Sequence, residues 1–144
     1  MELKEQVTSL ELSKKLKELG VKQESLFYWE TYRSDQFDEA PHPKIINFKE
    51  EPGFSENSLY SAFTVAELGE MLPVVIESPP YTIQYLKQGN SGLWTLNLCD
   101  DFRHKIEFNI QEKSEADARA KMLIYLLENN LMEIPKRSPE KLAA

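Results

Sequence analysis

Residues 81–110 read YTIQYLKQGNSGLWTLNLCDDFRHKIEFNI, and this stretch decides the fold. Apolar and polar residues alternate in three runs, which are separated by the loop KQGNSG (87–92) and by the short segment 99–101. Alternation with a period of two is typical of strands that bury one face. The stretch therefore predicts three strands, each with one buried face, that pair antiparallel across two turns.

The lengths of the two turns predict which residues lie opposite each other. A three-residue turn at 99–101 pairs Leu98 with Phe102, Leu96 with His104, and Trp94 with Ile106. The loop over 87–92 likewise sets Tyr85 near Trp94, Ile83 near Leu96, and Tyr81 near Leu98. Paired residues point to the same side of a sheet. The predicted buried face therefore contains Trp94, Leu96, Leu98, Phe102, Ile106 and Phe108, with His104 buried and hydrogen-bonded in its middle.

Three further blocks have the pattern of amphipathic helices. Each begins with a Ser or Thr followed three residues later by an acidic residue, which is the spacing of a capping box: Thr8 and Glu11, Thr64 and Glu67, Ser114 and Asp117. The first helix is predicted to start at residue 8 or 9 and to stop at Gly20, the second is short and ends at Pro73, and the third runs to about Asn129. The second half of the third helix is apolar almost all round, which requires burial on two sides or a partner surface.

The fold class predicted from these elements is α+β. We expect a mainly antiparallel sheet of four or five strands, with two longer helices packed on one face and one short helix. The additional strands are predicted at residues 26–32 (LFYWETY) and at 44–48 (KIINF). Residues 1–133 should form a single domain, and residues 134–144 a flexible tail, because the tail contains two prolines and charges of both signs.

Composition limits the classes of partner. The chain has 144 residues, a formal net charge of −7 and a pI of about 4.9. Nucleic acids and anionic membrane surfaces should repel such a chain. Cys99 is the single cysteine, so no internal disulfide can form. No segment resembles a membrane span or a signal peptide, so a cytoplasmic protein is expected.

Two groups of residues could carry catalytic or metal chemistry. Asp35, Asp38, Glu39 and His42 offer ligands for a divalent metal. Pro41 and Pro43 forbid the helix that the Glu39 and His42 spacing requires, so a solvated acidic loop is the favoured interpretation. Cys99 and His104 suggest a nucleophile and a base, but the predicted register favours a structural cysteine and a core histidine. No cofactor is predicted.

Two other clusters have a structural and a functional interpretation. Asp100 and Asp101 could pair for acid or metal chemistry, although adjacent acidic residues in a tight turn more simply form the turn. The aromatic cluster Phe27, Tyr28, Trp29 and Tyr32 could stack on single-stranded bases, but it lacks basic neighbours, so core packing is favoured.

Three blocks of the chain resemble those of a group of small uncharacterised proteins from bacterial phages, prophages and other mobile elements. The blocks are SLELSKKLKELGVKQESLFYW (9–29), SAFTVAELGEMLP (61–73) and SEADARAKMLIYLLENN (114–130). The resemblance omits residues 33–58 and the tail. It implies no known activity and no site residues, but it implies a setting in which accessory proteins often bind host or phage proteins.

From these observations we predict a non-enzymatic interaction or accessory protein of a mobile element that binds an unidentified protein. The predicted interaction segment is 33–58, because it is long, lacks periodicity and mixes acidic residues with isolated phenylalanines. A variable loop under no functional demand is the alternative interpretation of this segment. Its candidate partner-binding residues are Phe37, Asp38, Glu39 and Phe54. The alternative is a small enzyme with a site around His104 and the acidic loop residues.

Overall fold

The computed structural model describes residues 2–30, 44–46, 59–73, 75–76, 80–87 and 92–135. Its helices are η1 (Leu3–Glu5, a 3₁₀ turn), α1 (Leu10–Glu18), α2 (Val65–Met71) and α3 (Glu115–Glu128). Its strands are β1 (Phe27–Glu30), β2 (Lys44–Ile46), β3 (Leu59–Ala62), β4 (Val75–Ile76), β5 (Tyr81–Lys87), β6 (Trp94–Asp100) and β7 (Lys105–Glu112). All strand pairs are antiparallel, so the α+β class is confirmed.

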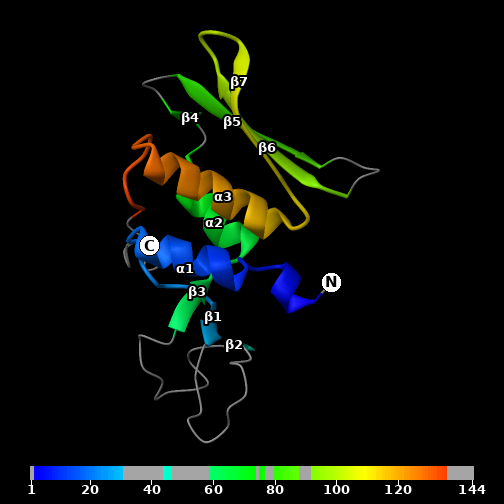
Figure 1. Ribbon diagram of the computed structural model, residues 1–144, viewed down its shortest axis with the longest axis vertical. Helices are drawn as coiled ribbons and strands as arrows, with labels where there is room; N and C mark the ends of the chain where they lie inside the picture. Colours follow the sequence, from blue (N-terminus) through cyan, green and yellow to red (C-terminus); the bar gives the residue numbers. More distant parts are fainter. Residues whose placement is uncertain are drawn as a thin grey trace, which may run out of the picture.

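The strands form two sheets where one was predicted. One sheet has the order β2-β1-β3, and the other has the order β4-β5-β6-β7. The helices lie between the two sheets (Figure 1), and α2 directly follows β3 in the chain. Strand β3 was not predicted, because residues 59–62 (LYSA) do not alternate between apolar and polar residues.

The predicted register of β6 and β7 is wrong, although the predicted face is largely right. Leu98 pairs with Phe108 and Leu96 with Ile110, because the turn occupies residues 101–104 and not 99–101. The shift is an even number of residues, so these side chains keep their predicted face. A bulge next to Cys99 then pairs that residue with Ile106, which turns Ile106 to the opposite side.

The burial of the predicted face follows from this register. Leu96 and Leu98 are fully buried, and Phe108 is partly buried where its ring stacks on Tyr125 with centroids 3.7 Å apart. In contrast, Phe102 is 81% exposed in the turn and Ile106 is 56% exposed. Both were predicted to be buried, and both predictions are wrong. In the pairing of β5 and β6 the register is displaced by two residues, which again preserves the faces: Tyr85 lies opposite Leu96.

The helix boundaries agree closely with the capping signals. Thr64 and Glu67 form the complete capping box of α2, and Ser114 caps α3. For α1 the N-cap is Ser9 and not Thr8. The Thr8 hydroxyl instead accepts a hydrogen bond from the backbone N–H of Phe63 (3.1 Å), which ties the start of α1 to the segment after β3.

Helix α3 is apolar almost all round because it is buried on two sides within the chain, so its surface does not require a partner. It contacts β6 and β7 on one side and α1 and α2 on the other, as Figure 1 shows. Its fully buried residues are Ala116, Ala118, Ala120, Met122, Leu123 and Leu126. The principal contacts of α1 are with β3 and α3, so α1 and α3 do not share one sheet as their main support.

Two polar contacts join α1 and its N-cap to α3, and one of them is the ion pair between Lys15 and Glu128 (3.3 Å). The backbone N–H of Ser9 donates a hydrogen bond to Oδ1 of Asp117 in the first turn of α3 (2.8 Å). Burial raises the pKa of Asp117 above its ordinary value of 3.8, and the nearby Glu112 carboxylate raises it further. The hydrogen bonds from Ser9 and the charge of Lys121 act in the opposite direction.

Replacing Asp117 with Asn tests this pKa shift, because the amide keeps an oxygen for Ser9 but does not titrate. A raised native pKa means that the folded state binds the proton of Asp117 more tightly than the unfolded state does. Protonation therefore stabilises the folded state, and this contribution to the free energy of unfolding is fully present only below pH 3.8. We expect the free energy of unfolding of the wild type, relative to D117N, to fall as the pH rises from below 3.8 through the native pKa. Urea titrations across this window measure the difference, and a difference that grows with pH contradicts the prediction.

A pair of Leu to Ala substitutions tests the two faces of the larger sheet. Leu96 is fully buried beneath the helices, whereas Leu86 on the adjacent strand is exposed on the other face. L96A should cost about 2–5 kcal/mol of stability through lost transfer energy and a cavity. The matched control L86A should stay within about 0.5 kcal/mol of the wild type. Denaturant unfolding measures both, and similar costs for the two variants would contradict the assignment of faces.

Candidate interaction surface

Among the residues that the structure describes, no helix covers one face of the larger sheet. The helices all lie on the opposite side (Figure 1), and the register defines which side chains point away from them. We call this the outer face, and its paired residues are Val75, Thr82, Gln84, Leu86, Thr95, Asn97, Cys99, Ile106, Asn109 and Gln111. None of them is charged, although 28% of the chain is.

A row of amides crosses the middle of the outer face. Asn97 lies opposite Gln84 on one side and Asn109 on the other. The Asn97 side-chain N–H donates to Oε1 of Gln84 (3.2 Å), and the Asn109 side-chain N–H donates to Oδ1 of Asn97 (2.6 Å). These bonds hold the three side chains in a fixed arrangement across three strands.

Apolar side chains flank this amide row. Leu86 is exposed on one side of the row, and Val75 and Ile106 are exposed on the other. Val75 and Ile106 belong to the same cross-strand row, because Val75 pairs with Thr82, and Cys99 pairs with both Thr82 and Ile106. The outer face thus carries three exposed apolar side chains, which lie apart from one another on three different strands.

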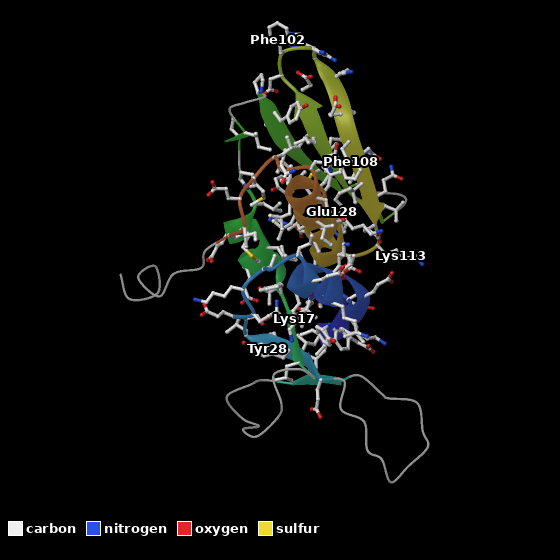
Figure 2. The ribbon with its side chains drawn as sticks, turned by 60° about the vertical axis from the view of Figure 1, so that its left-hand side comes forward. Lys17, Tyr28, Phe102, Phe108, Lys113 and Glu128 are labelled. Atoms are coloured by element: carbon white, nitrogen blue, oxygen red, sulfur yellow. The ribbon has the colours of Figure 1, made fainter. Side chains whose placement is uncertain are left out.

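The turn between β6 and β7 displays Phe102 at the end of this face. Oδ1 of Asp100 accepts hydrogen bonds from the backbone N–H groups of Phe102 and Arg103, both at 3.0 Å. The backbone N–H of Asp101 donates to the carbonyl oxygen of Pro80 (2.9 Å), and the Thr82 hydroxyl donates to Oδ2 of Asp101 (2.5 Å). The turn is thus fixed from both sides, and Phe102 lies at the tip of the hairpin (Figure 2).

The structure overturns the prediction for His104 and supports the one for the two aspartates. His104 is exposed in the turn, with a left-handed backbone (φ 54°), and is not a core residue. Cys99 lies at the end of β6 and not in the turn, where it is partly exposed on the outer face. Because both Asp100 and Asp101 use their carboxylates to hold the turn, they are turn-forming residues.

The other predicted site residues fall mostly outside the described residues. This applies to Phe37, Asp38, Glu39 and Phe54, and also to the candidate metal ligands Asp35 and His42. Within the described residues no group of three or more His, Cys, Asp or Glu side chains could hold a metal ion. The predicted interaction segment is therefore untested, and the outer face is a surface that sequence reasoning missed.

Two aromatic side chains of β1 donate hydrogen bonds to backbone carbonyl groups. The Trp29 indole N–H donates to the carbonyl oxygen of Thr8 (2.7 Å), and the Tyr28 hydroxyl donates to the carbonyl oxygen of Gln23 (3.1 Å). Phe27, Tyr28 and Trp29 are each partly buried, whereas Tyr32 lies outside the described residues. None of these three residues belongs to the hydrophobic core or packs directly against it, so the predicted core packing is not confirmed.

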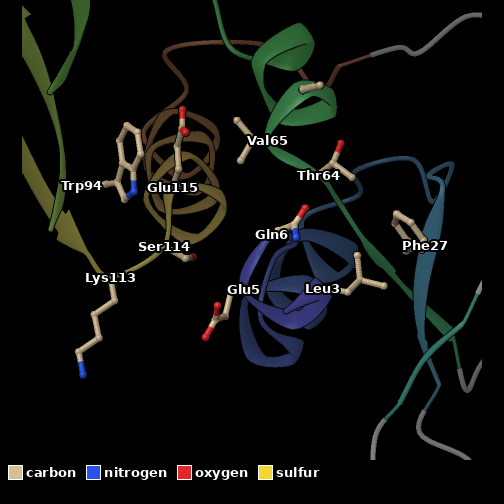
Figure 3. Close-up of a pocket in the computed structure, with 11 residues that line it drawn as sticks. Leu3, Glu5, Gln6, Phe27, Thr64, Val65, Trp94, Lys113, Ser114 and Glu115 are labelled. Atoms are coloured by element: carbon tan, nitrogen blue, oxygen red, sulfur yellow. The ribbon is translucent and has the colours of Figure 1, made fainter. Parts of the chain in front are cut away.

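A cavity of about 630 Å³ opens between the two sheets near the starts of α2 and α3 (Figure 3). Trp94, Phe27 and Leu3 form part of its apolar wall, and Lys113 and Glu115 are among its charged residues. The Glu115 carboxylate is ion-paired with Arg119 (2.7 Å), and the Ser114 hydroxyl accepts the helix-capping bond from Asp117 N–H (3.0 Å). Both groups are committed to α3, so neither forms a nucleophile and base pair in the cavity.

Comparisons of the chain with protein-family models, curated proteins and solved structures find no match. The resemblance to proteins of mobile elements therefore stays a prediction. Over the described residues, the structure contains no helix that is long and apolar enough to cross a membrane.

The hydrogen bonds of Asp100 give a direct test of how the turn is built. D100A should destabilise the protein by about 1–3 kcal/mol, because it removes a buried acceptor from two backbone N–H groups. It should also speed amide hydrogen exchange at Phe102 and Arg103. D100N should lose less, because its amide oxygen can accept the same bonds. Unchanged exchange at both amides in D100A would show that other contacts fix the turn.

Proposed function

We propose that this chain is a non-enzymatic protein-binding module, and that the outer face together with Phe102 forms its recognition surface. The observation that carries the proposal is the absence of charge from the paired residues of the outer face in a chain with a net charge of −7. Depletion of charge is what distinguishes the core of a protein interface from ordinary surface. The expected accessory role in a mobile element, in the cytoplasm, belongs to the same proposal.

The hairpin turn adds an anchoring residue to this surface. An exposed Phe whose backbone is already fixed loses little conformational freedom on binding, so more of its burial energy contributes to affinity. Phe102 meets this condition, because Asp100 holds its backbone N–H and the neighbouring Asp101 is bonded to Pro80 and Thr82. Such an anchor next to an uncharged face suits a protein partner with an apolar pocket.

The alternative of a small enzyme gains no support from the described residues. It requires His104 to act with nearby carboxylates, but Asp100 and Asp101 are engaged in the turn. The acidic residues within 35–39 lie outside the described residues. We therefore retain the binding module as the proposed function.

A pull-down with the tagged full chain tests this proposal. F102A should weaken retention of a partner from host lysate by about tenfold or more, as expected for an aromatic anchor. It should leave stability within about 0.5 kcal/mol of the wild type, because Phe102 is exposed. The matched control is L26A, since Leu26 is 61% exposed and lies just before β1, away from the larger sheet. Undiminished retention by folded F102A, or equal loss in L26A, would refute the proposed surface.

A further inference from the structure

We infer that the open edge of β5 binds an extended segment of another protein, which adds to the larger sheet as a further strand. The open edge is residues 83–87 of β5. β4 pairs only with Tyr81 and Thr82 at the start of β5 (Figure 1), and no described residue pairs with the open edge on that side. This site is separate from the recognition surface proposed above, because backbone groups at the edge of the sheet form it.

One hydrogen bond establishes which backbone groups face the open edge. The N–H of Asp101 donates to the carbonyl oxygen of Pro80 (2.9 Å), next to the first pair of the ladder between β5 and β6, and the register of that ladder is uninterrupted. In an antiparallel ladder, residues that bond the neighbouring strand alternate with residues whose backbone groups point away from it. Even-numbered residues of β5 therefore bond β6, and the N–H and C=O groups of Ile83, Tyr85 and Lys87 point to the open edge.

These backbone groups specify the kind of partner. Donors and acceptors at alternate residues are paired most completely by another extended backbone, as in recognition by strand addition. The neighbouring side chains suit a strand as well. Tyr85 is 38% exposed on the inner face of the sheet, and Leu86 is 43% exposed on the outer face. An added strand therefore covers apolar surface on both of its faces.

Contacts with α3 hold Tyr85 in place at this edge. The guanidinium carbon of Arg119 lies 4.6 Å from the centroid of the Tyr85 ring. Arg119 also donates two hydrogen bonds to Oε2 of Glu115 (2.9 and 2.7 Å), which fixes its own position. A ring that is already positioned loses little conformational freedom when a partner covers it. We therefore expect an apolar residue of the added strand opposite Tyr85.

Charge favours a segment of another protein over a second copy of this chain. Lys87 is the only charged side chain of β5, and its ammonium lies 5.1 Å from the centroid of the Trp94 ring on β6, so it does not occupy the open edge. A carboxylate opposite Lys87 in the added strand forms a favourable cross-strand pair. β5 has no acidic residue to supply one, and two chains of net charge −7 repel each other.

The peptide acetyl-Glu-Val-Val-Thr-Val-amide is a probe with this chemistry. All strand pairs of the structure are antiparallel, and in this orientation the probe places its Glu opposite Lys87 and its second Val opposite Tyr85. NMR titration of the isotope-labelled full chain measures binding. We expect saturation with a dissociation constant of about 1 mM or tighter, and the absence of binding at about 10 mM overturns the inference.

Methylation of single peptide nitrogens tests the mode of binding. The N–H groups of the first, third and fifth residues of the probe point to β5, whereas those of the second and fourth point away. N-methylation of the third residue should weaken binding about tenfold or more, because it removes a hydrogen bond to the Tyr85 carbonyl. The matched control, N-methylation of the fourth residue, should weaken binding by about twofold or less. Equal losses at the two positions contradict strand addition.

A charge swap tests the orientation of the added strand. K87E should weaken binding of the probe about threefold or more, and a probe with Lys in place of Glu should recover the loss. The matched control K105E should leave binding unchanged, because Lys105 lies on β7 at the opposite edge of the sheet. Circular dichroism checks that both variants are folded. A probe that binds K87E and the wild type equally overturns the proposed orientation.

Amide hydrogen exchange distinguishes this partner from the alternatives. In the free chain, the amides of Ile83, Tyr85 and Lys87 should exchange faster than those of Gln84 and Leu86, and the probe should slow them. Slow exchange of all five amides at low protein concentration would show that the chain itself covers the edge. Slow exchange that appears only at high protein concentration would identify a second copy as the occupant. Either outcome overturns the proposed partner.

Discussion

The structure depends on the burial of α3 on two sides. The first half of this helix buries Ala116, Ala118 and Ala120, whose small side chains let neighbouring elements approach its backbone closely. The second half buries Met122, Leu123 and Leu126 and adds the stacking of Tyr125 on Phe108. Because α3 contacts α1 and α2 as well as β6 and β7, it is the element through which the rest of the core is connected. A chain of this size has one main core, and here a single helix supplies its centre.

This arrangement leaves the larger sheet with only one covered face. All of the described helices lie between the two sheets, and α3 packs across the inner face of the larger sheet. No described element packs across its outer face. An open face of an antiparallel sheet normally carries charged or strongly polar side chains that keep it in water. Here the amides of Gln84, Asn97 and Asn109 satisfy one another, and the flanking positions are apolar or weakly polar. The face is therefore polar enough to remain in contact with water. Because it is uncharged, removing it from water costs little free energy.

Local chemistry explains what could be predicted from the sequence. Thr64 and Glu67 specify a helix start because their side chains and backbone groups bond each other within three residues, and no distant contact is needed. The inner face was predicted because alternation survives any even shift in register, as the pairing of Leu98 with Phe108 shows. The bulge beside Cys99 was not predictable, since a single extra residue leaves no signature in composition, yet it reverses the side to which Ile106 points. The misplacement of His104 has a different cause, because the turn was predicted at residues 99–101 and His104 was therefore assigned to the strand.

The free edge of β7 is another place where this sheet could associate, and its chemistry argues against that route. Edge strands in stable proteins are commonly protected by charged side chains and by bulges, which make continuous pairing with another strand unfavourable. β7 begins at Lys105, whose Nζ atom lies 3.9 Å from the carboxylate of Glu107. The bulge of β7 lies in the same region. At its other end Glu112 is ion-paired with Lys121 of α3, so pairing there would have to accommodate a side chain already engaged with the helix. The paired residues of the outer face include no charged side chain, and this difference from the edge of β7 supports the proposal that the face, and not this edge, binds a partner.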